Sequence, residues 1–274
     1  MTFGARLRAA MDARGPFCPG IDPHASLLHA WGLEDTPAGL ERFALTAVEA
    51  LAPVAAVVKP QSAFFERHGS RGVAVLEQVV ATAREAGALV LLDVKRGDIG
   101  STAEAYADAY LDPASPLAAD AMTASPFLGL GSLAPLVDAA RRHDAGLFVL
   151  ALTSNPGAEQ VQRARTSGQT VAGEVLAALT ALNAGAQPLG SFGAVVGATI
   201  GSADEDLAIN GPLLAPGVGA QGGTTEDVRR IFGASLGNVL PSSSREVLSA
   251  GPDPVALRDA VQRANAELAG LVAR

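Results

Sequence analysis

Two lysines stand out among the basic residues of this chain. Of its 20 lysines and arginines, only Lys59 and Lys95 are lysines. Arginine carries a permanent charge on a planar group, whereas a lysine ammonium can release a proton and its pKa responds to its surroundings. If a site here transfers a proton from a cation, these two residues are the first candidates.

Lys95 lies within an acidic pattern, Asp93-x-Lys95-x-x-Asp98, that follows the apolar run 89–92. Asp93 and Lys95 are two residues apart, so on an extended segment both side chains point to the same side. An ion pair with a purely structural role at a strand end would give the same pattern. The charges are nevertheless candidates for an active site, because perturbed acid–base groups gather at such sites.

Lys59 ends a second apolar run, 54–58, and is followed by Pro60. A lysine in this place could extend its ammonium to solvent along the strand. However, both lysines of the chain end neighbouring predicted strands, and in a barrel they would face the same mouth. This coincidence favours a shared site over surface solvation.

Apolar runs alternate with amphipathic, alanine-rich stretches along the 274 residues. We expect strands at 17–21, 54–59, 88–94, 119–123, 146–152, 192–198, 213–215 and 236–240, and helices near 38–52, 71–87, 102–111, 130–143, 168–185, 203–209, 224–232 and 254–272. This alternation is typical of a parallel sheet covered by helices, and eight such units in about 250 residues fit a (β/α)8 barrel. We therefore predict an α/β fold in which residues 1–274 form a single-domain TIM barrel, with the active site at the carboxyl ends of its strands. The polar 153–168 segment is expected to be a long loop, and an open doubly wound sheet is less suited because no GxGxxG follows an early strand.

Composition excludes several classes of function. The formal net charge is −8 and the pI is about 5.0, which argues against nucleic acid as a main partner. One cysteine and four scattered histidines make a metal cluster improbable, so no metal is expected. No uninterrupted apolar run reaches the roughly eighteen residues of a membrane span, and no signal peptide is visible, so we expect a cytoplasmic protein without membrane contact. We interpret Cys18 as a small buried residue and His24 as a solvated one.

The residues around the two lysines resemble the orotidine 5′-monophosphate decarboxylase family. Asp93-x-Lys95-x-x-Asp98-Ile99-Gly100, with a preceding Lys59, is similar to the family pattern, and 59–66 is similar to its bacterial type 2 branch. The likeness runs nearly end to end and includes Gly20-Ile21-Asp22-Pro23, Thr123-Ala124-Ser125-Pro126, Pro216-Gly217-Val218-Gly219-Ala220-Gln221-Gly222-Gly223 and Pro241-Ser242-Ser243-Ser244-Arg245. Together these segments are far more specific than any one of them.

The resemblance implies removal of CO₂ from C6 of orotidine 5′-phosphate (OMP) to give UMP, without metal or organic cofactor. Fixed charges would then have to stabilise a carbanion at C6. Lys95 would stabilise this carbanion and protonate it, and Asp93 would lie near the departing carboxylate. Lys59 and Asp98 would complete an alternating network that holds Lys95 charged and aimed.

The resemblance also implies contacts with the ligand and with a second copy of the chain. Asp98 and Thr102 would reach into the neighbouring site of a homodimer. Asp22 would accept a hydrogen bond from a ribose hydroxyl, and Ser125 would contact the pyrimidine. The remaining implied contacts come from Pro216, Gln221 and Arg245, of which the last two would hold the phosphate.

Three alternatives remain open. A magnesium-dependent hexulose-phosphate synthase or keto-gulonate-phosphate decarboxylase of the same superfamily would share the Asp-x-Lys-x-x-Asp pattern. Those enzymes resemble one another in placing a carboxylate where this chain has Lys59, and a cation there opposes metal binding. A Schiff-base aldolase that uses Lys95 or Lys59, or an inert phosphate-ligand binding barrel, would also fit the scaffold.

Overall fold

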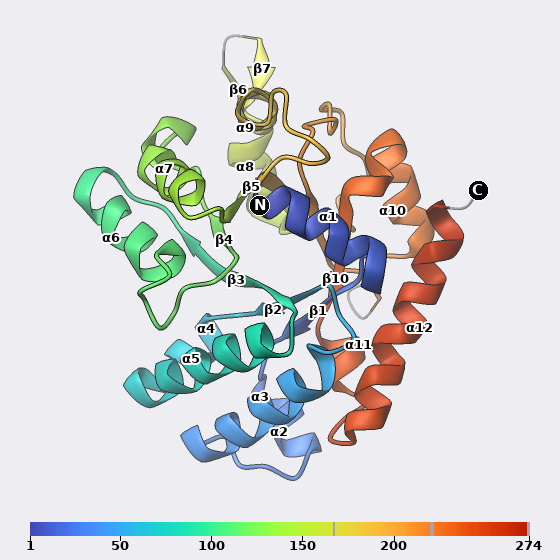
Figure 1. The fold of residues 1–274 in the computed structure, drawn as a ribbon. Helices are drawn as coiled ribbons and strands as arrows, with labels where there is room; N and C mark the ends of the chain where they lie inside the picture. The colour runs from blue at the N-terminus through green and yellow to red at the C-terminus, as the bar shows by residue number, and fades with distance from the viewer. Residues whose placement is uncertain (167, 220–221, 273–274) are drawn as a thin grey trace.

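A closed barrel of parallel strands forms the centre of the molecule. The computed structural model describes residues 1–166, 168–219 and 222–272. In this part of the chain, eight parallel strands close in the order β1-β10-β9-β8-β5-β4-β3-β2 (Figure 1). They are β1 (Cys18–Ile21), β2 (Val57–Pro60), β3 (Leu89–Arg96), β4 (Ala121–Ala124), β5 (Gly146–Leu152), β8 (Phe192–Val196), β9 (Leu213–Pro216) and β10 (Val239–Ser243). The predicted α/β barrel is confirmed.

Helices surround the barrel and cover its outer face (Figure 1). They are α2 (Ala25–Ala30), α3 (Pro37–Leu51), α4 (Ala63–Glu66), α5 (Gly69–Glu85), α6 (Gly100–Leu111), α7 (Ala134–Arg142), α8 (Glu159–Gln162), α9 (Val171–Leu182), α10 (Thr225–Phe232), α11 (Arg245–Leu248) and α12 (Pro254–Val272). Helix α3 shows why these segments are helical: Thr36 accepts a hydrogen bond from the Gly39 N–H, Pro37 opens the first turn, and Leu40 and Phe43 face the core. Helix α12 packs against α3, so the end of the chain returns to its first units.

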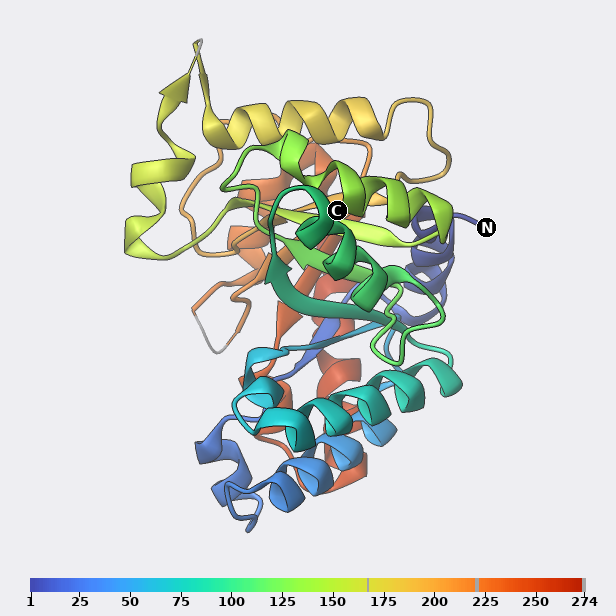
Figure 2. The same cartoon turned by 90° about the vertical axis from the view of Figure 1, so that its left-hand side faces the viewer.

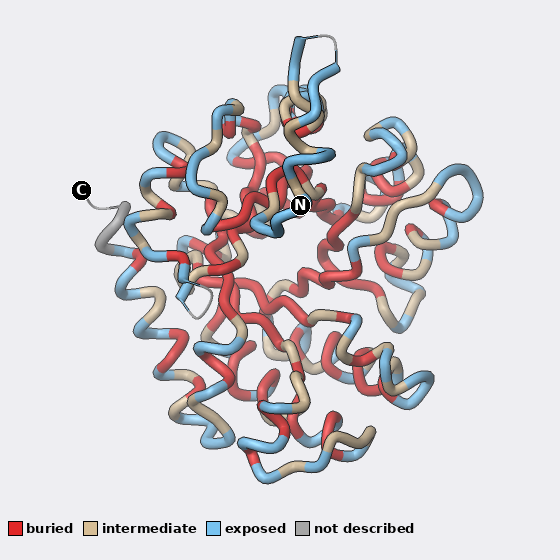
Figure 3. Tube along the Cα trace, turned by 180° about the vertical axis from the view of Figure 1, so that it is seen from behind, coloured by how far each residue is buried: buried red, intermediate tan, exposed pale blue. Residues whose placement is uncertain are grey.

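The hydrophobic core has two layers. The larger one lies between the strands and the helices, and Figure 3 shows buried segments along the barrel and on the inner sides of the helices. The smaller one fills the barrel interior and includes Cys18, Leu91, Phe148, Leu214 and Leu240. Strands that are buried on both faces must be apolar throughout, which explains why the strand positions are readable from the sequence.

An N-terminal helix that the sequence analysis missed, α1 (Phe3–Arg14), closes one end of the barrel. Phe3, Leu7 and Met11 lie on one face of it and join the interior cluster, where the Phe3 and Phe148 rings meet edge to face. Figure 2 shows α1 at one end of the molecule and the hairpin β6 (Arg165–Thr166) and β7 (Gln169–Thr170) at the other.

Four predictions about elements were wrong. Residues 203–209 are not helical; Leu207 and Ile209 are both buried, a spacing of two that is not that of a helix face. Strand β2 begins at Val57, three residues later than expected, because a turn precedes it. The last strand begins at Val239, also three residues late, because the 3-10 helix η3 (Gly233–Asn238) precedes it. The polar 153–168 segment is not an open loop throughout, since it contains the 3-10 helix η2 (Pro156–Ala158), α8 and β6.

Within the part of the chain that the structure describes, none of the helices has the length and apolar composition needed to cross a membrane.

Candidate active site

A cavity of about 430 Å³ opens at the carboxyl ends of the strands. Its described lining comprises Asp22, His24, Lys59, Gln61, Asp93, Lys95, Thr123, Leu150, Val195, Leu214, Pro216, Gly217, Val218, Ser242, Ser243, Ser244 and Arg245. Active sites of this fold lie at the same end of the barrel, so the fold and the cavity point to the same place.

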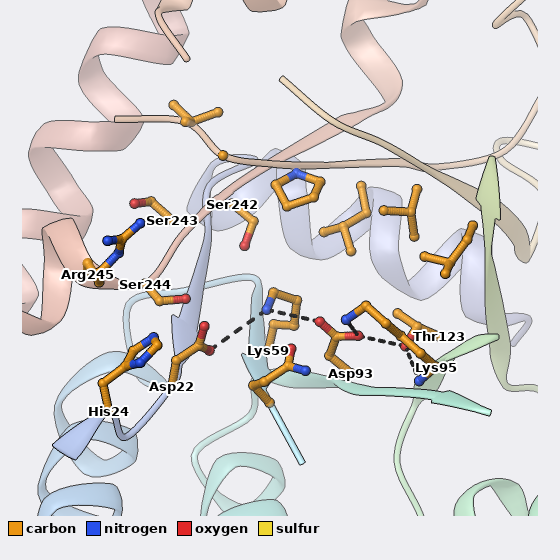
Figure 4. A pocket seen from close by; sticks show the side chains of 17 residues that line it. Asp22, His24, Lys59, Asp93, Lys95, Thr123, Ser242, Ser243, Ser244 and Arg245 are labelled. Atoms are coloured by element: carbon orange, nitrogen blue, oxygen red, sulfur yellow. Dashed lines mark hydrogen bonds and ion pairs between the residues drawn. The ribbon is translucent and has the colours of Figure 1, made fainter. Parts of the chain in front are cut away.

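Four charged side chains form an alternating row across the cavity (Figure 4). The Lys59 ammonium lies 3.9 Å from Asp22 Oδ1 and 3.5 Å from Asp93 Oδ2. The Lys95 ammonium lies 2.6 Å from Asp93 Oδ1. The sequence prediction that both lysines face one mouth and that Asp93 and Lys95 point to the same side is thus confirmed.

Thr123 at the end of β4 completes the surroundings of Asp93. Its hydroxyl donates to Asp93 Oδ1 at 2.8 Å, and it accepts from the Lys95 main-chain N–H at 2.9 Å. Each carboxylate oxygen of Asp93 therefore faces a cation, and Oδ1 also accepts a hydrogen bond from the Thr123 hydroxyl. Such support from neighbouring strands restricts the side chains to one arrangement before any ligand arrives.

Burial and opposite charges act against each other in this row. Burial alone would raise the pKa of Asp93, but Lys59 and Lys95 outweigh it, so the pKa of Asp93 is lowered. Burial would likewise lower the pKa of Lys59, yet the carboxylates of Asp22 and Asp93 raise it above its usual value. Asp93 is thus a carboxylate and Lys59 an ammonium at neutral pH.

Asp22 marks the other end of the row. Its Oδ1 is buried and has no hydrogen-bond partner among the described residues, so it can accept a hydrogen bond from a ligand.

Gly20 lies against Ser244, where a Cβ would come within 1.9 Å of the Ser244 hydroxyl. A glycine at this position therefore lets the ends of β1 and β10 approach closely. Figure 4 shows His24, Ser244 and Arg245 gathered at this end of the cavity.

An apolar surface closes the deep side of the cavity. Leu150, Val195 and Leu214 line it, and all three belong to or pack against the cluster in the barrel interior. The site therefore combines an alternating charged row with an apolar floor. Charges beside such a floor act at a lower effective dielectric than charges in water.

The structure separates the predicted site residues into groups. Asp22, Lys59, Asp93, Lys95, Pro216 and Arg245 line one cavity. Asp98, Thr102 and Ser125 are not among its described lining residues; Asp98 Oδ1 accepts from the Ile99 N–H at 2.8 Å, and Thr102 is exposed on α6. Gln221 lies outside the described residues. The roles assigned to all ten residues remain predictions.

Several lining residues were missed by the sequence analysis. His24, interpreted as solvated, lies in the cavity wall with its ring 4.1 Å from that of Phe64. Gln61 and Thr123 stood in quoted motifs and could have been found, because each closely follows or ends a predicted strand. Ser242 and Ser243 lie beyond the predicted strand 236–240 but belong to β10, where both are buried.

No group of three or more histidine, cysteine, aspartate or glutamate side chains among the described residues is arranged to hold a metal ion. Lys59 occupies the middle of the charged row, and its ammonium would repel a cation placed between Asp22 and Asp93. Cys18 is fully buried, and burial raises the pKa of its thiol to about 12, so it is not a thiolate ligand.

The sequence matches the profile of the orotidine 5′-phosphate decarboxylase / HUMPS family over residues 15–260. The chain belongs to this family. The match includes the eight barrel strands and all six predicted residues of the cavity.

Individual relatives are similar over nearly their full length. An orotidine 5′-phosphate decarboxylase from Nocardioides sp. is 69% identical over 270 residues, which cover 97% of this chain and 98% of that protein. A crystal structure from Streptomyces avermitilis, provisionally given the same name, is 62% identical with a TM-score of 0.96 and covers 100% and 96% of the two chains. The OMP decarboxylase of Leishmania donovani is 30% identical with a TM-score of 0.76 and covers 99% of each chain.

Proposed function

We propose that this protein decarboxylates OMP to UMP. Family membership and relatives at up to 69% identity over the whole chain support this activity. The observation that carries it is the row Asp22–Lys59–Asp93–Lys95, which places an exposed ammonium next to a buried carboxylate at the cavity mouth. A reaction that expels a carboxylate as CO₂ and then needs a proton uses both groups.

In the proposed reaction, the bond between C6 and the substrate carboxylate breaks, CO₂ leaves, and the electron pair remains on C6. The Lys95 ammonium stabilises this carbanion and then transfers a proton to it, which leaves a neutral amine and UMP. Lys95 is 45% exposed, so it can regain the proton from water. Arginine could not replace it, because its proton is not released at physiological pH.

Asp93 has two proposed roles. As a carboxylate, it holds the Lys95 ammonium in place at 2.6 Å. It also lies where the substrate carboxylate would come close, so that repulsion between the two falls as CO₂ forms. Lys59 lies on the other side of Asp93 and keeps it ionised. Leu150, Val195 and Leu214 form the apolar floor of the cavity. This floor favours neutral CO₂ over the charged substrate carboxylate from which CO₂ forms.

The polarity of the cavity gives the substrate one orientation. We propose that Arg245 and Ser244 bind the phosphate. We also propose that Asp22 Oδ1, which has no hydrogen-bond partner among the described residues, accepts a hydrogen bond from a ribose hydroxyl. The pyrimidine then lies toward Lys95, at the opposite end of the row (Figure 4). Phosphate binding far from C6 can thereby position the reacting carbon.

We also propose a homodimer in which Asp98 and Thr102 enter the partner's cavity. Neither lines the cavity of its own chain, although both follow Lys95 closely in sequence. Three large apolar side chains on the loops after β3 and β4 are strongly exposed: Ile99 (62%), Phe127 (75%) and Leu128 (54%). Burying such side chains against a second copy would be favourable.

We propose that residues 1–274 act as one catalytic domain and that the protein functions in the cytoplasm.

The test is the loss of OMP absorbance with purified protein in excess EDTA, together with identification of UMP as the product. Conversion under these conditions would support both the reaction and its independence of metal. The proposal fails if OMP is unchanged and a ketose phosphate reacts once magnesium is restored, because that result would place the protein in the metal-dependent branch.

A further inference from the structure

The main chain at Lys95 adopts a conformation that needs support. Its φ is +46°, in the left-handed region that residues other than glycine rarely adopt. Pairing between β3 and β4 is irregular over the same stretch, from Leu92 to Arg96. A strained backbone persists only where its surroundings hold it. The place of the Lys95 ammonium therefore depends on what anchors the end of β3.

Two hydrogen bonds attach this end to β4 and to the residue after it, one to a side-chain hydroxyl and one between main chains. The Lys95 N–H donates to Thr123 Oγ1 at 2.9 Å, and the Ser125 N–H donates to the Arg96 carbonyl at 2.8 Å. Gly97 lies against the same segment, since a Cβ there would come within 2.3 Å of the Ser125 carbonyl oxygen. These contacts hold one side of the strand end. On the other side the Ser62 N–H donates to the Asp93 carbonyl at 3.2 Å, two residues before Lys95, and the Arg96 side chain adds contacts beyond that point.

Arg96 makes several contacts at once. Its Nη2 donates to Glu66 Oε1 at 2.5 Å and to the Tyr110 hydroxyl at 3.1 Å. Its guanidinium lies over the rings of Tyr106 and Tyr110, at 5.5 and 5.7 Å from their centroids. Arg96 is not among the described residues that line the cavity, so it has no direct access to a ligand there.

The partners of Arg96 come from segments that carry the proposed catalytic groups. Glu66 ends α4, the helix that follows Lys59 and β2. Tyr106 and Tyr110 lie in the second half of α6, which begins at Gly100, two residues after Asp98. One side chain thus connects the end of β3 with α4, which follows β2, and with the second half of α6.

We propose that Arg96 is a positioning residue for Lys95. It keeps the end of β3 in its left-handed turn and so holds the Lys95 ammonium against Asp93, without touching the substrate. The planar guanidinium can donate to Glu66 and Tyr110 while it stacks on aromatic rings, whereas a lysine cannot do both. The inference depends on the proposed decarboxylation only because the kinetic test uses OMP and UMP as ligands.

The experiment compares Arg96→Lys and Tyr110→Phe with the wild type in kcat, in KM for OMP and in deuterium exchange at C6 of UMP in D₂O. Exchange reverses the proton transfer from Lys95 and needs no decarboxylation. We expect Arg96→Lys to lower kcat by about 10- to 100-fold, as for other small misplacements of a reacting group, with little change in KM. Exchange should fall in parallel, and Tyr110→Phe should act in the same direction more weakly.

The matched control is Arg67→Lys. Arg67 forms a bidentate ion pair with Asp35, and its side chain is 36% exposed against 27% for Arg96. It is not among the described residues that line the cavity. This variant should leave kcat, KM and exchange unchanged. If replacing an ion-paired arginine by lysine lowered activity regardless of its place, the same loss would appear in this variant.

The inference is overturned if folded Arg96→Lys and Tyr110→Phe retain kcat and exchange within about 2-fold of the wild type, or if only KM changes. If Arg96→Lys does not fold, Tyr110→Phe decides alone. A crystal structure of a folded variant gives a readout without substrate: Lys95 should leave the left-handed region in Arg96→Lys. The structure of the variant tests the inference without substrate. If the wild-type protein fails to convert OMP, the proposed function is overturned, but the inference about Arg96 is still decided by this structure.

Discussion

The Lys59 ammonium lies 3.5 Å from the Asp93 carboxylate, and both residues are almost completely buried, at 5% and 7% exposure. A buried charge that loses its partner keeps its desolvation cost without the compensating attraction. Lys59 is shared between two carboxylates, so its removal leaves both Asp22 and Asp93 without their common cation.

Lys59→Met should therefore lower the free energy of unfolding by roughly 3–5 kcal/mol, measured by urea denaturation at pH 7. The double variant Lys59→Met/Asp93→Asn should recover part of this loss, because it removes a buried carboxylate whose Oδ2 would otherwise have lost its cation. Equal stability of Lys59→Met and the wild type would contradict the proposed electrostatic role of this residue.

The lowered pKa of Asp93 predicts the pH range in which it stabilises the fold. Because its pKa is lower in the folded than in the unfolded protein, the unfolded state binds the proton more readily, and stability rises with pH through this range. The contribution is present above the unfolded pKa of about 3.9 and is lost as pH falls through the folded value. The stability difference between wild type and Asp93→Asn should be constant near neutral pH and shrink below about pH 4. Urea titrations at several pH values would reveal it, and a difference that grew on acidification would have the wrong sign.

Lys95 is expected to be essential for turnover. Lys95→Ala should reduce kcat by at least about 10³-fold, since it removes both a charge facing the carbanion and the proton donor. Lys95→Arg should be nearly as inactive, although it retains the positive charge. Both variants should still bind UMP in a calorimetric titration, because the phosphate site is at the other end of the cavity. Normal turnover by either one would remove Lys95 from its assigned role.

Arg245 is expected to act through the phosphate. Arg245→Ala should raise KM for OMP by about 10- to 100-fold, the effect of losing a charge-assisted hydrogen bond. Orotidine without the phosphate provides the control, since its slow turnover should be the same in the variant and the wild type. An unchanged KM for OMP would show that another group binds the phosphate.

The shared site can be tested by mixing two inactive variants. In a heterodimer of Lys95→Ala and Asp98→Asn chains, one site carries both defects and the other carries none. Random exchange of equal amounts should restore about a quarter of wild-type activity, because half of the dimers are mixed and each has one intact site. If each chain used its own Asp98, mixing would restore nothing.

Much of the fold is readable from the sequence, because barrel strands are buried on both faces and must be apolar in runs. The runs that became β3 and β5 were predicted within two residues of their observed bounds. The same physics placed Asp93 and Lys95 on one side of β3, and both lysines at one mouth. Local periodicity and the ends of apolar runs were sufficient for these features.

The rest depended on contacts between distant segments. Gly20 meets Ser244 only because β10 closes the barrel against β1, and Thr123 reaches Asp93 only because β4 pairs with β3. The expected helix at 203–209 failed because burial of alternate residues in tertiary contacts overrode local helical preference. The sequence by itself determined which residues are charged and at the ends of which strands they lie. Only the tertiary structure decided which polar groups face those charges, since hydrogen bonds and ion pairs depend on distances that strand pairing sets.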